Sequence, residues 1–240
     1  MPNRDPLRTH LEGLLGASLP DYHVFQRAVS SIALQPQDLL FDVGIVDRRF
    51  FFVVAGILSV GIVQGSGREW IRRFAGPGEL VSGVPPLGHP VGGAAAALHA
   101  MPAQTRGQLI LTQYRVRAIT RVNVRAVDAA VFWGLAARHR EWMALALMGA
   151  LAASAAHEKR ERELLTLTAE DRYRLLAAER PQLIGRVPQK DLARYIGVTP
   201  VAMSRIVTRI RLGQRTATDA AEAAFDSTDT DASGRSIDAG

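Results

Sequence analysis

Cysteine is absent from this chain of 240 residues. That absence excludes a disulfide scaffold, thiolate catalysis, cysteine-ligated iron–sulfur clusters and four-cysteine zinc sites. Long apolar runs are also missing, because the two candidates, residues 50–63 and 142–156, are shorter than the ~20 residues that cross a bilayer. The N-terminus has no apolar core of the kind found in signal peptides. We therefore expect a soluble, cytoplasmic protein with no membrane partner.

The motifs of common enzyme classes are missing as well. The sequence contains no G-x-S-x-G, no Walker loop and no dinucleotide-binding fingerprint, and Gly65-Ser66-Gly67 is most simply a hairpin turn. Metal-binding spacing such as H-x-x-x-H is absent around His10, His23, His139 and His157. We therefore expect neither an enzyme nor a metal site.

Charge is distributed unevenly along the chain. The formal net charge is +6, but residues 214–240 carry two arginines against six carboxylates, a net charge of −4. Residues 1–213 therefore carry +10. A basic body indicates a polyanionic partner, although an ordinary solvated basic surface is the alternative. The acidic tail has few apolar residues, and we predict that it is disordered.

In the first half of the chain, a residue pattern typical of a helix is followed by patterns typical of β-strands. Leucines at helical spacing predict one short helix within residues 1–24, closed by Pro20. Short β-rich runs separated by glycine and proline then predict a sandwich or barrel. These runs are residues 39–41, 50–54, 57–63, 70–74, 109–111 and 114–119. Residues 83–108, rich in glycine, proline and alanine, predict an insertion or lid over the barrel.

A long helix is predicted next, because residues 142–162 contain no proline and only one glycine. Small residues on one stripe would let another helix approach closely. We predict a homodimer interface on this helix, with a helix buried in its own chain as the alternative. The predicted interface residues are Trp142, Leu145, Gly149, Ala152 and Ala156. Thr168 with Asp171 then resembles a helix start, which places the domain boundary at residues 164–168.

The segment 187–207 is the most informative part of the sequence. A short helix with an apolar face is predicted from Leu192, Ala193 and Ile196. Gly197 can supply a turn with positive φ, and Thr199 as N-cap with Pro200 in the first turn can open a second helix. Two short helices joined by a tight turn are typical of a helix-turn-helix, with an ordinary helical hairpin as the alternative.

The charge of this segment supports contact with DNA, because residues 186–213 carry a net charge of +5. We expect Arg205 to read a base directly, since a guanidinium can bond to both O6 and N7 of guanine. We expect thymine-methyl contacts or shape readout at Pro200 and Val201, and phosphate contacts from Arg186, Gln189, Lys190 and Arg209. The complete predicted DNA-binding set is Arg186, Gln189, Lys190, Thr199, Pro200, Val201, Ser204, Arg205, Thr208 and Arg209.

Short motifs over about residues 24–212 support a wider resemblance. In the C-terminal part they are residues 163–173, 179–181, 186–189 and 197–200 together with Ser204-Arg205-Ile206. In the N-terminal part they are Leu40-Phe41, residues 51–58, Arg72-Arg73-Phe74 and Pro77-Gly78-Glu79-Leu80. With these motifs the chain resembles a Crp/Fnr-type transcription regulator.

The resemblance implies an α+β fold with an N-terminal double-stranded β-helix (β-roll), a long dimerisation helix and a C-terminal winged helix-turn-helix. It implies a sensor roll over residues 1–127, connecting and dimerisation helices over 128–165, and a DNA-binding domain over 166–213, followed by the tail. The wing would need strands around residues 182–187 and after 211. Double-stranded DNA, a second copy of the chain and RNA polymerase are the implied partners.

The effector is where this sequence departs from the family. Relatives that bind cAMP hold its phosphate with an Arg-Ser pair, which falls here at Thr112 and Gln113, so the charge-assisted contact is missing. This argues against cAMP as a cofactor. A haem iron is an alternative through His89, His99 or Met101, although lone histidines are more often ordinary side chains. The predicted effector pocket consists of Glu79, Thr112, Gln113, Arg115 and Ser154.

Together these observations predict a homodimeric, sequence-specific transcription regulator that binds a palindromic DNA site. The alternative is a signalling module that binds a ligand in its β-roll but does not contact DNA directly.

Overall fold

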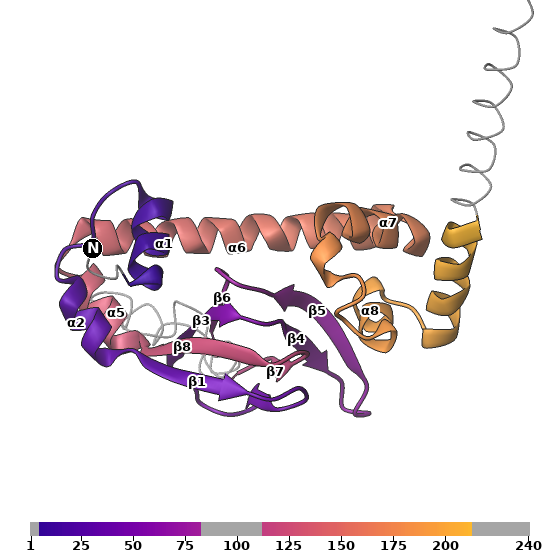
Figure 1. The fold of residues 1–240 in the computed structure, drawn as a ribbon, viewed down its shortest axis with the longest axis horizontal. Coiled ribbons are helices and arrows are strands. Elements are labelled where there is room, and N and C mark those ends of the chain that lie inside the picture. The colour runs from indigo at the N-terminus through magenta and orange to yellow at the C-terminus, as the bar shows by residue number, and fades with distance from the viewer. Residues whose placement is uncertain (1–4, 83–111, 213–240) are drawn as a thin grey trace, which may run out of the picture.

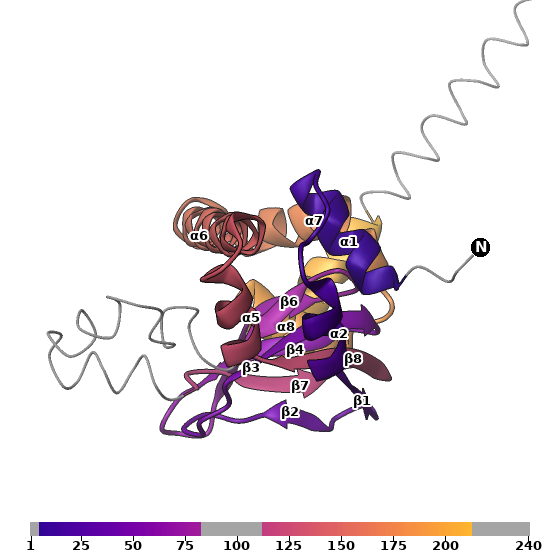
Figure 2. The same cartoon turned by 90° about the vertical axis from the view of Figure 1, so that its left-hand side faces the viewer.

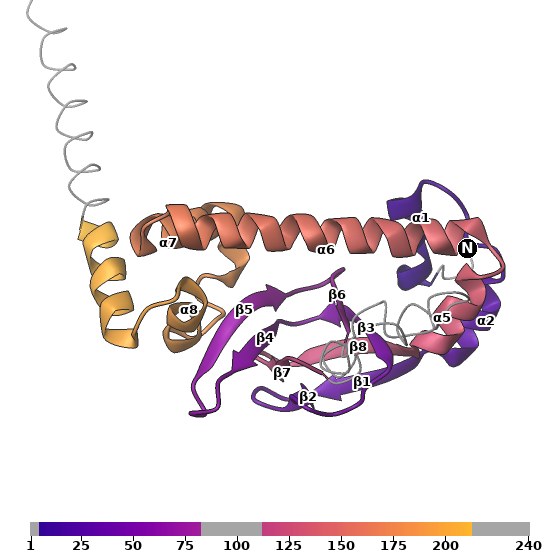
Figure 3. The same cartoon turned by 180° about the vertical axis from the view of Figure 1, so that it is seen from behind.

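The computed structural model describes residues 5–82 and 112–212. The predicted insertion at 83–108, the predicted strand at 109–111 and the acidic tail lie outside the described residues. The long helix α6 (Arg140–Thr166) runs along the length of the molecule, with strands beneath it (Figures 1 and 3). The N-terminal helices lie at one end of α6, and α7 (Ala169–Glu179) and α8 (Gln189–Ile196) lie at the other.

Within residues 5–82 and 112–212, the strands form two antiparallel sheets of four strands each. The first sheet has the order β1 (Ser30–Leu34), β8 (Val122–Asp128), β3 (Arg49–Ala55) and β6 (Leu80–Ser82). The second has the order β2 (Leu39–Phe41), β7 (Arg115–Ala118), β4 (Leu58–Val63) and β5 (Glu69–Ala75). Neighbouring strands come from distant parts of the chain, as in a β-roll, and the predicted fold class is confirmed.

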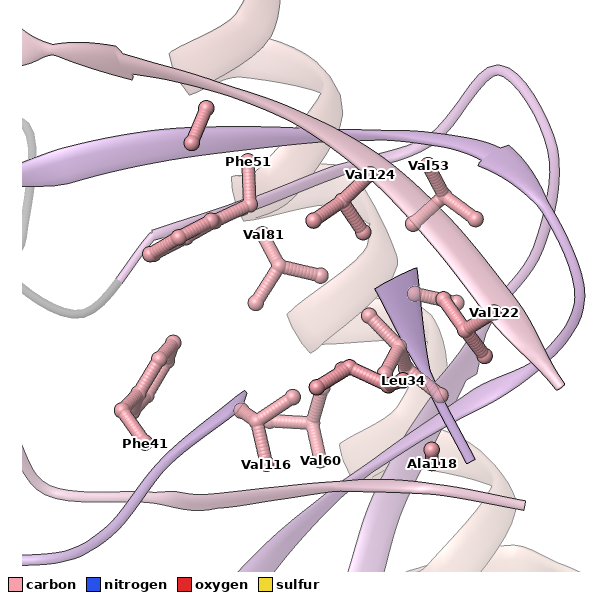
Figure 4. Close-up of a cluster of buried hydrophobic side chains, with 13 residues drawn as sticks. Leu34, Phe41, Phe51, Val53, Val60, Val81, Val116, Ala118, Val122 and Val124 are labelled. Carbon is pink, nitrogen blue, oxygen red and sulfur yellow. The ribbon is translucent and has the colours of Figure 1, made fainter. Parts of the chain in front are cut away.

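A dry core fills the space between the two sheets, as Figure 4 shows. Its side chains alternate along the strands with outward-facing ones, which is the period of a half-buried strand. In β8, for example, Val122 and Val124 are buried while Asn123 and Arg125 are exposed. The buried members of this core are Leu34, Phe41, Phe51, Val53, Leu58, Val60, Ala75, Val81, Val116, Ala118, Val122, Val124 and Ala126.

A second core joins the roll to the beginning of α6. Helices α1 (Pro6–Leu15), α2 (Tyr22–Ala28) and α5 (Ala129–Ala136) surround Trp142, whose side chain is fully buried. Its indole nitrogen donates a hydrogen bond of 2.8 Å to the carbonyl of Pro20. The rings of Tyr22, Phe25 and Phe132 lie around it. This aromatic cluster fixes α6 relative to the roll, and in Figure 2 α5 lies between the strands and α6.

Several boundaries differ from the sequence predictions. The single N-terminal helix is two helices, because α1 ends at Gly16 in the left-handed conformation and Pro20 precedes α2 instead of closing α1. Strands β1, β6 and β8 were not predicted, and the long helix extends two residues earlier and four residues later than residues 142–162. Trp142, predicted at a dimer interface, is an intramolecular core residue. In residues 5–82 and 112–212, no helix combines the length and apolar character needed to cross a membrane.

Replacing Trp142 with alanine should lower the free energy of unfolding by about 3–5 kcal/mol, because it leaves a cavity beside three aromatic side chains. Denaturant titration followed by circular dichroism measures this change. Leu14→Ala is the matched control, since Leu14 is 53% exposed and its loss should cost little. Equal losses for the two variants would contradict the role given to Trp142.

Candidate nucleic-acid interface

The C-terminal helices of the molecule begin where α6 ends. Leu167 has extended backbone angles, and Thr168 caps the next helix by accepting a hydrogen bond of 3.2 Å from the amide of Asp171. A threonine oxygen at this position satisfies an amide that the helix itself cannot pair. The predicted helix start at Thr168 is therefore confirmed, and the chain reverses at this point, so that Glu179 at the end of α7 accepts a hydrogen bond of 2.5 Å from Lys159 of α6 (Figure 1).

Two helices joined by a glycine turn follow. Leu192, Ala193 and Ile196 bury the apolar face of α8, as predicted. Gly197 has φ +88°, a conformation that costs glycine little, and its amide donates to the carbonyl of Ala193 at 2.9 Å. The hydroxyl of Thr199 then accepts from the amide of Ala202 at 3.2 Å, and a helix spans residues 200–212. This is the geometry of a helix-turn-helix.

The helix 200–212 buries one side and exposes the other. Met203 and Ile206 are buried, whereas Val201, Ser204, Arg205 and Thr208 are exposed. Residues three and four apart share a face of a helix, so these four side chains form one accessible stripe. In Figures 1 and 3 this helix projects at the end of the molecule, away from the roll.

All of the predicted DNA-binding residues are exposed in the structure. Gln189 and Lys190 open α8, and Thr199 and Pro200 open the helix 200–212. Arg209 differs from the others because its guanidinium bonds at 2.9 Å to the carboxylate of Glu170 on α7, although its side chain is 70% exposed. An exposed ion pair of this kind is weak and can exchange for a phosphate.

Two arginines that the sequence predictions missed attach α8 to the helices before it. Arg172 of α7 donates to the carbonyls of Leu167 at 2.6 Å and Ile196 at 3.0 Å. Arg160 of α6 lies over the ring of Tyr195, 4.0 Å from its centroid, and also donates to the carbonyl of Tyr195. These contacts satisfy carbonyls at the C-terminal end of α8, which its own backbone leaves unpaired. No sequence signal separates these arginines from solvated ones in a charge run.

The wing is not formed where it was predicted. Residues 182–187 contain no strand, because the amides of Ile184, Arg186 and Val187 are used in local turns after the 3₁₀ helix Pro181–Leu183. Leu183 and Val187 are instead buried under the helices. The prediction of a strand at 182–187 is therefore wrong, and most of the region after 211 lies outside the described residues.

The residues predicted to form one effector pocket instead contact different partners. Thr112 is fully buried, accepts from the amide of Ile45 at 3.1 Å and donates to the carbonyl of Asp42. Arg115 binds the carboxylate of Asp42 through two bonds of 2.8 and 2.9 Å. Hydrogen bonding from Arg115 is the main cause that lowers the pKa of Asp42 below its usual value.

The other members lie elsewhere. Glu79 binds Arg73 at 3.2 Å and Arg180, just after α7, at 2.7 Å. Ser154 lies on an exposed part of α6, and Gln113 is exposed beside Thr112. His89, His99 and Met101 lie outside the described residues, and within the described ranges no cluster of three His, Asp or Glu could hold a metal. The effector pocket therefore stays a prediction.

Comparison with known proteins gives matches of structure only. No protein-family model matches the sequence, and no curated protein matches it significantly. FixK2 from Bradyrhizobium japonicum superposes with a TM-score of 0.62 at 15% identity, over 78% of this chain and 86% of that chain. A putative transcriptional regulator of the Crp/Fnr family from Eubacterium rectale gives a TM-score of 0.62 at 10% identity, over 85% and 88%.

A third similar structure is the c-di-GMP responsive global regulator CLP of Xanthomonas campestris, with a TM-score of 0.55 at 15% identity, over 80% of this chain and 91% of that chain. The matches span most of both chains, so they include the roll, the long helix and the helix-turn-helix together. The fold of this chain is similar to that of these solved structures: a β-roll is followed by a long helix and a helix-turn-helix.

Proposed function

We propose that this protein is a sequence-specific DNA-binding transcription regulator and that the helix 200–212 is its recognition helix. The observation that carries the proposal is the exposed stripe of Val201, Ser204, Arg205 and Thr208 on a helix fixed by the turn at Gly197. A helix presented in this way fits the major groove, whose base edges it can contact from its N-terminal half. Two of the similar structures, a global regulator and a putative transcriptional regulator, support this proposal.

The exposed polar residues divide into two roles. Arg205 projects from the middle of the stripe and is suited to bidentate contact with guanine. Gln189 and Lys190 begin α8, where side chains and free backbone amides can meet phosphate oxygens together. Arg186, before α8, and Arg209, on the helix 200–212, add further positive charge. Phosphate contacts give affinity that depends on salt, while base contacts give sequence preference.

We further propose that the protein acts as a homodimer formed along α6. The middle of this helix is exposed in the single chain, including Leu147 and Leu151 at 59% and 61%. Gly149, Ala152 and Ala156 are exposed on another face of the helix, so these three small positions remain open to a second helix. Two-fold symmetry would then place two recognition helices on a palindromic site with half-sites about one helical turn apart.

Selection from a randomised duplex pool, with and without cAMP and at two salt concentrations, tests the function. We expect one palindromic motif to be enriched equally in both arms, because the positions of the phosphate-binding pair are occupied by Thr112 and Gln113. Enrichment only with cAMP would contradict our reading of those two positions. No enrichment in any arm would favour a signalling module that does not contact DNA.

Arg205→Ala should weaken binding to the selected site by about 1–3 kcal/mol and relax the preference at one base position. Lys190→Ala should instead weaken binding to all sequences and reduce the dependence of affinity on salt. Fluorescence anisotropy with the selected duplex and with single-base variants measures both. The same uniform loss in the two variants would refute this division of roles.

Gly149→Leu should weaken dimerisation by preventing close approach of the paired α6 helices. Sedimentation equilibrium measures the dissociation constant, and we expect at least a tenfold rise, which is about 1.4 kcal/mol. Arg140→Ala is the control on the same helix, since the Arg140 side chain is 95% exposed and lies outside the stripe. An unchanged dimer in Gly149→Leu would remove this stripe from the interface.

A further inference from the structure

The helix-turn-helix is docked on the outer face of the roll. Helix α8 lies against β5, as Figures 1 and 3 both show. The contact has an apolar part, in which side chains from the roll and from the helical end form one cluster. The roll contributes Ile57, Ile71, Phe74 and Ile119, and the helical end contributes Leu176, Leu183, Val187, Leu192, Ala193, Ile196 and Met203.

Four charged side chains lie within this contact. Arg117 of β7 is 3.3 Å from Asp191 of α8 and 3.6 Å from Glu69 of β5. Arg194 of α8 is 3.1 Å from Asp191 and 3.3 Å from Glu69. The side chain of Asp191 is fully buried, and those of Glu69 and Arg117 are 8% and 10% exposed. Each arginine therefore bridges one carboxylate of the roll and one of the helix-turn-helix.

The carboxylates depend strongly on these arginines. Glu69 Oε1 and Asp191 Oδ2 have no hydrogen-bond partner among the described residues, so charge compensation rests on the other oxygen of each group. Removing one partner of a buried ion pair leaves an uncompensated charge, which is far more costly than losing a surface pair. The docked position of α8 is the one in which Asp191 meets Arg117.

The roll is shaped to hold this network. Gly61 of β4 leaves room for Glu69, since a Cβ at position 61 would lie 2.7 Å from Glu69 Oε1. Gln37, held at φ +80° in the turn before β2, accepts a hydrogen bond from the second terminal nitrogen of Arg117. The Arg117 guanidinium is therefore oriented by the roll itself toward α8.

Strand β7 also connects this network to another part of the roll. Arg115 lies two residues before Arg117 on the same strand and binds Asp42, whose carbonyl accepts from Thr112. Alternate residues of a strand project from the same face. A shift of β7 at Arg115 would therefore be transmitted within two residues to Arg117, the partner of Asp191.

We propose that Arg117 and Asp191 are positioning residues for DNA recognition: their buried ion pair fixes α8, and with it the recognition helix, in one orientation relative to the roll and α6. The proposal rests on the proposed function, because the orientation matters through the spacing of two recognition helices on DNA. Neither residue lies on the exposed stripe that meets the bases.

Amide hydrogen exchange of the free, full-length protein tests the attachment without DNA. In Arg117→Gln we expect exchange in residues 189–196 to accelerate at least about tenfold, because α8 opens from the roll more often. Arg49→Gln is the matched control, since Arg49 pairs at 2.8 Å with the buried carboxylate of Asp47 inside the roll. Exchange in residues 189–196 that is no faster in Arg117→Gln than in this control would overturn the proposal.

Selection of half-site spacing provides a readout that general destabilisation would not produce. The parent protein should select one spacing, whereas Arg117→Gln should accept several spacings with the same half-site sequence. A single unchanged spacing in Arg117→Gln would overturn the positioning role. If the parent protein selects no DNA at all, the proposed function fails, while the exchange experiment still decides whether the ion pair holds α8.

Asp191→Asn provides a second variant, of nearly unchanged volume, should Arg117→Gln not fold. It should also accelerate exchange in residues 189–196, and the double variant should exchange more slowly than the two single effects combined predict, because no unpaired charge remains. Single effects that simply add would show that the two residues act independently and would refute the pair.

Discussion

The unbroken backbone hydrogen bonding of α6 is the constraint on which the arrangement of this molecule depends. A helix of 27 residues is about 40 Å long and resists bending, so whatever is attached to its two ends is held at a fixed separation. The attachments differ in chemistry. At the N-terminal end the aromatic cluster around Trp142 buries apolar area, and at the C-terminal end an apolar cluster is joined by arginines that bind backbone carbonyls and carboxylates.

This difference matters for how the two ends respond to change. Apolar packing around Trp142 is non-directional and tolerates small adjustments, whereas an ion pair in a buried site is strongly dependent on geometry. Arg117 and Asp191 therefore respond to small displacements of β7 in a way that the aromatic cluster does not. The roll is therefore joined to the beginning of α6 by apolar packing, and to α8 by packing together with an ion pair that depends on geometry.

The sequence predicted those parts of the structure that are governed by local rules. Gly197, Thr199 and Pro200 each act within a few residues, so the turn and both helices around it were correctly placed. Leu167 and Thr168 likewise marked the break after α6. Residue patterns were also sufficient for most of the described strands, because β3, β4 and β5 are rich in branched and aromatic side chains.

Features that depend on partners distant in sequence could not be predicted in this way. Strand β1 has the sequence Ser-Ser-Ile-Ala-Leu and is a strand because it pairs with β8, about 90 residues later. Trp142 has the same local context whether it faces a second chain or its own α2. Arg117 and Asp191, 74 residues apart, show no pattern that links them. For the same reason, the residues that the resemblance grouped into one effector pocket bind different partners in the structure.

The way Arg160 and Arg172 hold α8 has a consequence for how this protein could change over evolutionary time. Both arginines bind main-chain carbonyls, those of Tyr195 and Ile196, which every residue type possesses. The attachment just before the turn at Gly197 therefore does not require particular side chains on the exposed stripe beyond it. Substitutions at Val201, Ser204, Arg205 or Thr208 can accumulate without loosening the helix that carries them, so the proposed recognition helix can acquire a different base preference while the architecture stays the same.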